Sequence, residues 1–171
     1  TPAGDASSPD MVQPTADQLV GVIRRLRQQP YKEGTREEVI AEFVKVQAQI
    51  IQAADMLLAL KPGDEAVTEA AGAKIEALMG VAQQGAKEAA GQLQAFLEEL
   101  KQHPSDVVKT FAQQQSFGTL LNAFSEGEVT DAQQVIDAFK KLAEQQPKEG
   151  GLLTFGRDVA ARFIEKGMTK E

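Results

Sequence analysis

The chain of 171 residues contains no cysteine and no tryptophan, one tyrosine and one histidine, and only 5% of its residues are aromatic. Without cysteine it cannot form a disulfide, a thiolate nucleophile or a cysteine-ligated zinc site. No stretch approaches the roughly 18 apolar residues that span a bilayer, so we expect no membrane insertion. Clusters of β-branched residues bounded by turn residues, which mark strands, are also missing. These absences favour an all-α protein.

Basic residues are few relative to acidic ones. The 18 Lys and Arg residues face 25 Asp and Glu residues, so the formal charge is -7 and the pI is about 4.9. Binding to a phosphate backbone requires a basic face, and we therefore expect no nucleic-acid partner. The largest basic cluster, Arg24, Arg25 and Arg27, is interpreted as the solvated side of a helix.

The sequence does contain regularly spaced signals for the starts and ends of helices. Two capping-box patterns, Thr15 with Gln18 and Thr35 with Glu38, each precede a periodic apolar segment. Asp64 and Ser105 are expected to cap further helices, while Gly85 and other single glycines fit the left-handed position that ends one. The spacing predicts about seven helices, at 15–29, 35–60, 64–84, 86–102, 105–126, 130–146 and 152–166.

Apolar residues recur every three or four positions along these segments, as buried helix stripes require. The stripe of the last helix includes Val159, Phe163 and Ile164. Gly72, Gly80 and Gly91 fall inside expected helices, where each costs about 1 kcal/mol against Ala, so we expect close helix approaches there. The large side chains predicted to be buried are Phe43, Ile50, Leu78, Phe96, Phe111, Leu120, Phe124, Phe139 and Phe163.

The spacing of the residues that end helices also repeats. Pro62, Pro104 and Pro147 are 42 and 43 residues apart, and each interval reads helix, glycine, helix. This predicts tandem hairpin units at about 63–104 and 105–147 within a single helical domain, 15–167. A disordered lead or linker, 1–14, precedes the domain, and a short tail, 168–171, follows it. The expected fold is a set of antiparallel hairpins stacked as a tetratricopeptide-like bundle, although that family's period of about 34 residues is shorter.

Side chains that could act in catalysis or bind a metal form no recognisable motif in the sequence. His103 stands alone before Pro104, where it suits the end of a helix. The acidic residues Glu37, Glu38, Glu98, Glu99 and Glu165 lie off the apolar stripes, and the serines fall at expected tails, caps and helix ends. We therefore assign no catalytic, cofactor-binding or metal-binding residue and expect no enzyme activity in this chain. An enzyme would need two or more carboxylates turned into one pocket with strongly raised pKa values.

Three segments resemble the helical region that precedes the thioredoxin domain in bacterial TlpA-like thiol-disulfide proteins: AADMLLALKPGDEA at 53–66, KIEALMGVAQQG at 74–85 and VAARFIEKG at 159–167. The resemblance covers most of 35–167. It implies a helical accessory domain of an exported or membrane-tethered redox protein, with a periplasmic or extracytoplasmic location. The family's Cys-x-x-Cys motif is not in this chain, so the resemblance transfers no redox residue and implies a redox domain that either was cut away or lies beyond Glu171.

Two functions of the interaction class remain open. In the first, the chain is a non-catalytic spacer or protein-binding scaffold within a thioredoxin-like protein. In the second, it is a free-standing helical-repeat scaffold that binds a peptide or partner helix in a groove between hairpins. Both predict a protein or peptide partner and no cofactor, and both leave the oligomeric state open.

Overall fold

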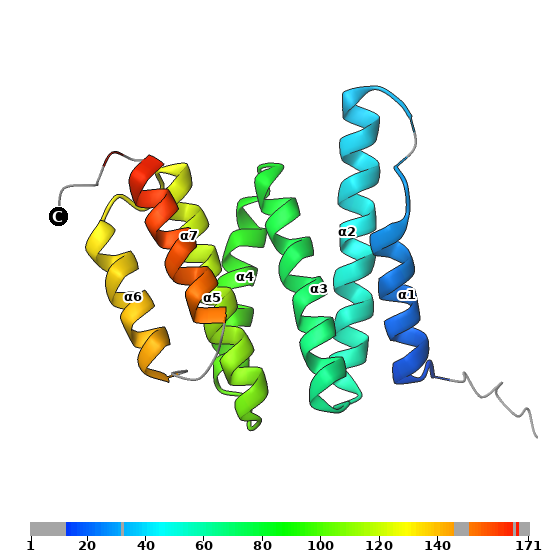
Figure 1. Ribbon diagram of the computed structural model, residues 1–171. Coiled ribbons are helices and arrows are strands. Elements are labelled where there is room, and N and C mark those ends of the chain that lie inside the picture. The colour runs from blue at the N-terminus through cyan, green and yellow to red at the C-terminus, as the bar shows by residue number, and fades with distance from the viewer. Residues whose placement is uncertain (1–12, 32, 146–150, 166, 168–171) are drawn as a thin grey trace, which may run out of the picture. The chain divides into compact units, whose positions relative to one another are not determined.

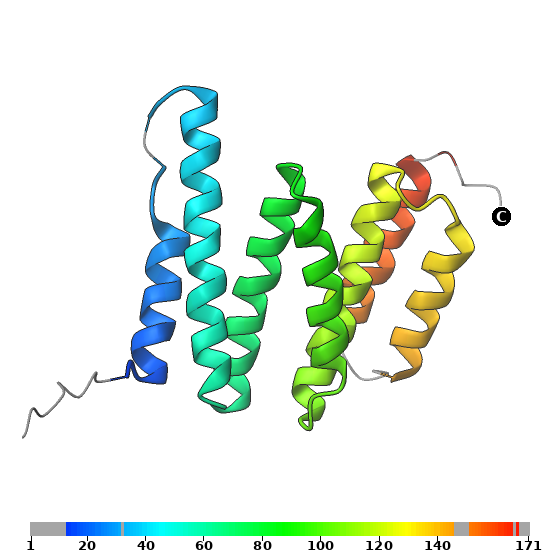
Figure 2. The same ribbon diagram turned by 180° about the vertical axis from the view of Figure 1, so that it is seen from behind.

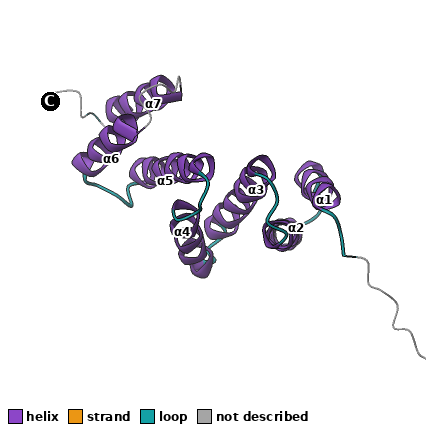
Figure 3. Ribbon diagram, turned by 90° about the horizontal axis from the view of Figure 1, so that it is seen from below, coloured by secondary structure: helices purple, strands orange, loops and turns teal. Residues whose placement is uncertain are grey.

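The computed structural model describes residues 13–31, 33–145, 151–165 and 167. These residues form helices joined by loops, with no strand among them (Figures 1 and 3), which confirms the predicted all-α class. All seven predicted helices are present in this part of the chain, with ends within two residues of those expected. They are α1 (Ala16–Gln28), α2 (Arg36–Ala59), α3 (Asp64–Gln83), α4 (Lys87–Lys101), α5 (Asp106–Glu126), α6 (Ala132–Gln145) and α7 (Gly151–Glu165).

Both predicted capping boxes are confirmed. The hydroxyl of Thr15 accepts the N–H of Gln18 at 3.3 Å, and the Gln18 side chain accepts the N–H of Thr15 at 2.9 Å. Thr35 and Glu38 make the same reciprocal pair at the start of α2. Each box satisfies two backbone donors that have no partner inside the helix, which is why α1 and α2 begin where the sequence indicated.

Two other predicted caps differ from the structure. The N-cap of α3 is Gly63, and Asp64 is the first helical residue, where its charge complements the helix dipole. Ser105 does occupy the N-cap position of α5, but its side chain makes no capping hydrogen bond. The predicted left-handed glycines are confirmed at Gly85 and Gly127, with φ of 94° and 83°.

The chain divides into two compact units, unit 1 (Thr1–Ala89) and unit 2 (Ala90–Glu171). The division falls in the first turns of α4, inside the expected hairpin unit 63–104. The tandem repeat, its tetratricopeptide-like stacking and the single domain 15–167 therefore stay predictions. Most of the expected lead 1–14, all of the tail 168–171 and the expected stop at Pro147 lie outside the described residues.

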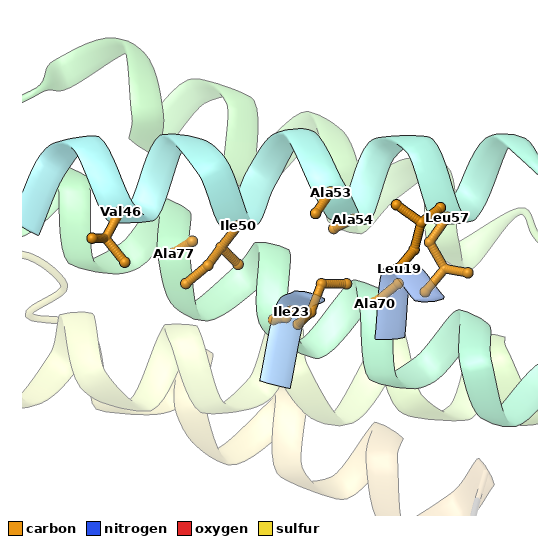
Figure 4. Close-up of a cluster of buried hydrophobic side chains, with 10 residues drawn as sticks. Leu19, Ile23, Val46, Ile50, Ala53, Ala54, Leu57, Ala70 and Ala77 are labelled. Atoms are coloured by element: carbon orange, nitrogen blue, oxygen red, sulfur yellow. The ribbon is translucent and has the colours of Figure 1, made fainter. Parts of the chain in front are cut away.

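Unit 1 is built on α1, α2 and α3, which pack against one another. Its core is unusually rich in alanine: α2 and α3 contribute five buried alanines, while α1 contributes Leu19 and Ile23 (Figure 4). Small side chains let neighbouring helices approach closely. The core cluster consists of Leu19, Ile23, Val46, Ile50, Ala53, Ala54, Leu57, Ala70, Ala73 and Ala77.

One close approach in unit 1 depends on a glycine. A Cβ added at Gly80 of α3 would lie 2.8 Å from Cζ of Phe43 on α2, so the aromatic ring lies directly over the glycine. Phe43 also packs against Tyr31, with ring centroids 5.7 Å apart. The predicted close approach is confirmed at Gly80 and wrong at Gly91, where no atom lies within 4 Å of such a Cβ. It stays a prediction at Gly72.

Unit 2 has a core of larger side chains from α5, α6 and α7, which are yellow-green to red in Figure 2. Phe124 is fully buried and meets Phe163 of α7 edge-on at a centroid distance of 5.3 Å. Phe117 meets Phe139 of α6 at 5.9 Å. The buried cluster consists of Phe117, Leu121, Phe124, Val135, Leu142 and Val159.

Most predicted core positions are inside, with one clear error. Of the nine large side chains expected to be buried, Ile50, Leu78, Phe96 and Phe124 are buried, and the other five are partly buried. Ile164, expected to face inward, is 63% exposed. Successive residues of a helix point about 100° apart. Because Phe163 takes the inward direction beside Phe124, its neighbour Ile164 turns to solvent.

Candidate functional site

An open depression of about 640 Å3 lies in unit 1 between α1 and the first turns of α3. The α1 side is supplied by residues one and two turns apart on one face, and the α3 side begins at its N-cap. Small residues keep the depression open. Its lining residues are Asp17, Val20, Gly21, Arg24, Gly63, Asp64, Glu65, Ala66 and Glu69.

The wall of the depression is closed by a two-point ion pair. Nε and Nη2 of Arg24 donate to the two carboxylate oxygens of Glu69 at 2.6 and 2.7 Å. This geometry matches the planar guanidinium fork to the carboxylate and sets the spacing of α1 and α3. The hydrogen bond and charge of Glu69 raise the pKa of Arg24, with a smaller contribution from Glu65. Arg24 is thus held in place inside the depression.

A second ion pair joins the same two helices, α1 and α3, further along their length. Nη2 of Arg27 donates to Glu76 at 2.6 Å, one turn further on α1 and two turns further on α3. The two pairs show that α1 and α3 run in the same direction. All four side chains keep contact with water, with 62% of the Arg24 side chain and 63% of the Glu76 side chain exposed.

Neither of these two ion pairs was predicted from the sequence. Arg24 and Arg27 were interpreted as a solvated helix face, and they are indeed exposed, but each also contacts α3. A signal was present: Arg24 and Arg27 are three residues apart, and Glu69 and Glu76 are seven apart, so each pair shares one helix face. Which two faces meet depends on the packing of α1 against α3, which no local pattern specifies.

The remaining carboxylates give the depression its negative charge. Asp17, Asp64 and Glu65 are exposed, and Glu69 is neutralised by Arg24. Asp64 and Glu65 also lie in the first turn of α3, where acidic side chains complement the helix dipole. The arrangement suits electrostatic attraction of a cationic group.

The residues singled out from the sequence are not brought together. Nδ1 of His103 accepts the backbone N–H of Ser105 at 3.2 Å, so this histidine supports the turn between α4 and α5, and its own backbone N–H donates to the carbonyl of Leu100 in the last turn of α4 at 3.1 Å. Glu37, Glu38, Glu98, Glu99 and Glu165 are exposed, as expected. Among the described residues no group of three or more His, Asp and Glu side chains is placed to hold a metal ion.

The serines of α5 are bound to their own helix. Ser116 was expected at a helix end but lies in the middle of α5, where its hydroxyl donates to the carbonyl of Ala112 at 2.8 Å. Thr119 and Ser125 donate in the same way to Gln115 and Leu121. Such bonds back to the preceding turn engage the hydroxyl hydrogen and fix the side chain along the helix.

None of the helices in the described part of the chain is long and apolar enough to cross a membrane. No protein-family model, curated protein or solved structure matches the chain. The residues themselves therefore carry the functional argument.

Proposed function

We propose that this chain is a non-catalytic interaction domain that uses the depression between α1 and α3 to bind a positively charged segment of a protein partner. The observation that supports it is the open, acidic lining: three exposed carboxylates lie beside small and apolar residues, and Arg24, the one cation among the described lining residues, is bound to Glu69. Complementary charge raises the association rate and selects partners.

The wider context we propose is an accessory domain of an exported thioredoxin-like protein, a spacer or scaffold beside a redox domain. The three segments that resemble TlpA-like proteins support this context. A free-standing scaffold that binds a partner helix is the second candidate. It is favoured by the way α2 and α3 already accept the amphipathic helix α1 on an alanine-rich face.

A peptide-binding experiment tests the first proposal. A fluorescently labelled Lys- and Arg-rich helical peptide is titrated into the full chain, and anisotropy is followed at low and high salt. The proposal expects saturable binding that weakens with salt, because exposed charges are screened within about 10 Å at 0.1 M ionic strength. The double variant Asp64→Asn, Glu65→Gln removes two lining charges and should weaken binding clearly.

The matched control is Glu98→Gln, Glu99→Gln, which removes the same number of exposed carboxylates from α4. If both double variants weaken binding equally, the peptide responds to net charge and the depression is not the site. The thioredoxin context has its own test. A native gene with no Trp-Cys-x-x-Cys segment within about a hundred residues after Glu171, the size of one domain, would remove it and leave the free-standing scaffold.

A further inference from the structure

The first helix, α1, occupies a groove formed by α2 and α3. Its buried side chains, Leu19 and Ile23, are four residues apart and enter the core from one face of α1, where α2 and α3 contribute five alanines together with Val46, Ile50 and Leu57 (Figure 4). Two larger side chains of one helix thus enter an alanine-rich face of two others. This is the geometry by which an amphipathic helix docks in a groove.

Two ion pairs fix the position of α1 along this groove. Arg24 binds Glu69 and Arg27 binds Glu76, so both bridges run from α1 to α3. An apolar pair four residues apart could shift along an alanine face. The bridges oppose such a shift, because the two arginines meet Glu69 and Glu76 together only at the observed register. The groove therefore recognises an apolar pair followed by two arginines, the pattern of α1.

A short segment connects α1 to α2. Seven residues, 29–35, join the end of α1 at Gln28 to the start of α2 at Arg36. Within them Tyr31 contacts α2 through the ring of Phe43 and accepts a hydrogen bond from Gln47 at 3.2 Å. Extended, seven residues reach about 23 Å. A segment of that length can either fold back along α2 or carry α1 to a neighbouring molecule.

We propose that α1 is exchangeable: the groove of α2 and α3 accepts α1 of a second copy of this chain, and reciprocal exchange gives a dimer. Every contact that holds α1 in its own groove is available unchanged from the second copy, as in domain swapping. A short linker gives an effective concentration in the millimolar range, so the intramolecular arrangement dominates in dilute solution. The length of 29–35 requires the α2 N-termini of the two copies to lie close together.

Charge-reversal variants of the full chain distinguish α1 bound in its own groove from α1 bound in the groove of a second copy. One variant carries Arg24→Glu and Arg27→Glu, and the other carries Glu69→Arg and Glu76→Arg. In each variant alone α1 and the groove have the same charge, both within a molecule and between molecules. When the two are mixed, α1 of each molecule is complementary to the groove of the other. The proposal therefore expects monomers for each variant alone and a one-to-one heterodimer in the mixture.

Sedimentation equilibrium measures the dimer, and hydrogen exchange of the α1 amides measures release of α1. Each variant alone loses two attractions and gains two repulsions, so the hydrogen-exchange rate of its α1 amides should rise at least about tenfold. Mixing the two variants should strengthen dimerisation by about the same factor. The quadruple variant restores opposite charges within one molecule. It should be monomeric, with α1 protection close to that of the parent chain.

A mixture that stays monomeric while α1 is released in each separate variant would overturn the exchange. A quadruple variant that keeps α1 unprotected would overturn the role of the two ion pairs. Protection of α2 and α3 amides shows that the rest of unit 1 remains folded. The proposed exchange of α1 between molecules does not depend on the proposed basic partner, because Asp64 and Glu65 are unchanged in all of these variants. A negative result in the peptide-binding experiment would therefore not contradict it.

Discussion

Adding one methyl group at Gly80 should separate the two opposing effects of a glycine inside a helix. The residue lies within α3, where Ala is favoured over Gly by about 1 kcal/mol because it restricts the unfolded backbone. Against this, the new Cβ would lie 2.8 Å from Cζ and 3.4 Å from Cε1 of Phe43. Carbon atoms in contact prefer about 3.5–4.0 Å, so the ring has to move.

Contact with Tyr31 opposes this movement of the Phe43 ring. The two ring centroids are 5.7 Å apart, and the Tyr31 hydroxyl accepts a hydrogen bond from Gln47. Overpacking of this kind costs about 1–3 kcal/mol. After subtracting the helix gain of about 1 kcal/mol, Gly80→Ala should lower the free energy of unfolding by about 0–2 kcal/mol. Gly91→Ala, at an open position in α4, should raise it by up to about 1 kcal/mol.

The measurement is urea unfolding followed by tyrosine fluorescence and by circular dichroism. The chain has one tyrosine and no tryptophan. The fluorescence therefore reports Tyr31 beside Phe43, the region that the substitution crowds. Replacing Phe43 by Leu shortens the side chain, so the loss caused by Gly80→Ala should shrink in that background. A Gly80→Ala protein as stabilised as Gly91→Ala, or a loss unchanged by Phe43→Leu, would refute the packing argument.

Three further outcomes are expected. Thr15→Ala removes the acceptor for Gln18 N–H and should cost about 1 kcal/mol, seen as faster hydrogen exchange in the first turn of α1; unchanged exchange would mean that the cap contributes nothing. Phe124→Ala should destabilise unit 2 by about 3–5 kcal/mol in urea unfolding, whereas Val107→Ala, at a site 59% exposed, should change stability by under about 0.5 kcal/mol; equal losses would contradict the burial. Hydrogen bonds from Thr35 lower the pKa of Glu38 below its ordinary value of 4.5, so its stabilisation of α2 is complete above pH 4.5 and is lost as the pH falls through the lowered value. NMR titration of the Glu38 carboxyl carbon should show this midpoint, and the variant Thr35→Ala should move it only part of the way back up, because the backbone N–H of residue 35 still donates to the carboxylate.

The helices could be predicted because their signals are local. A capping box such as Thr15 with Gln18 needs only four consecutive residues, and a glycine such as Gly127 ends a helix through its own φ of 83°. These interactions form within a turn or two of the chain and depend little on what packs nearby. For the same reason the predicted ends agree with the structure to within two residues.

Burial was less predictable where a helix is covered on several sides. From Val108 to Leu121 every residue of α5 is buried or partly buried, including the polar residues Gln113, Gln114 and Gln115. A helix enclosed in this way has no single apolar stripe, so periodicity cannot separate its inner face from its outer one. The exposed Ile164 shows the converse, since an apolar residue beside the stripe of α7 was assigned inward.

The candidate site depended on tertiary structure throughout. Asp17 and Arg24 lie on α1, Asp64 and Glu69 lie on α3, and more than thirty residues separate the two groups in sequence. The sequence by itself determined where each helix begins and ends, because caps, prolines and glycines act within one turn. Only packing decided that α1 lies in the groove of α2 and α3 with its arginines on Glu69 and Glu76. Ion pairs between distant segments exist only after burial of the alanine-rich core has set the helices side by side.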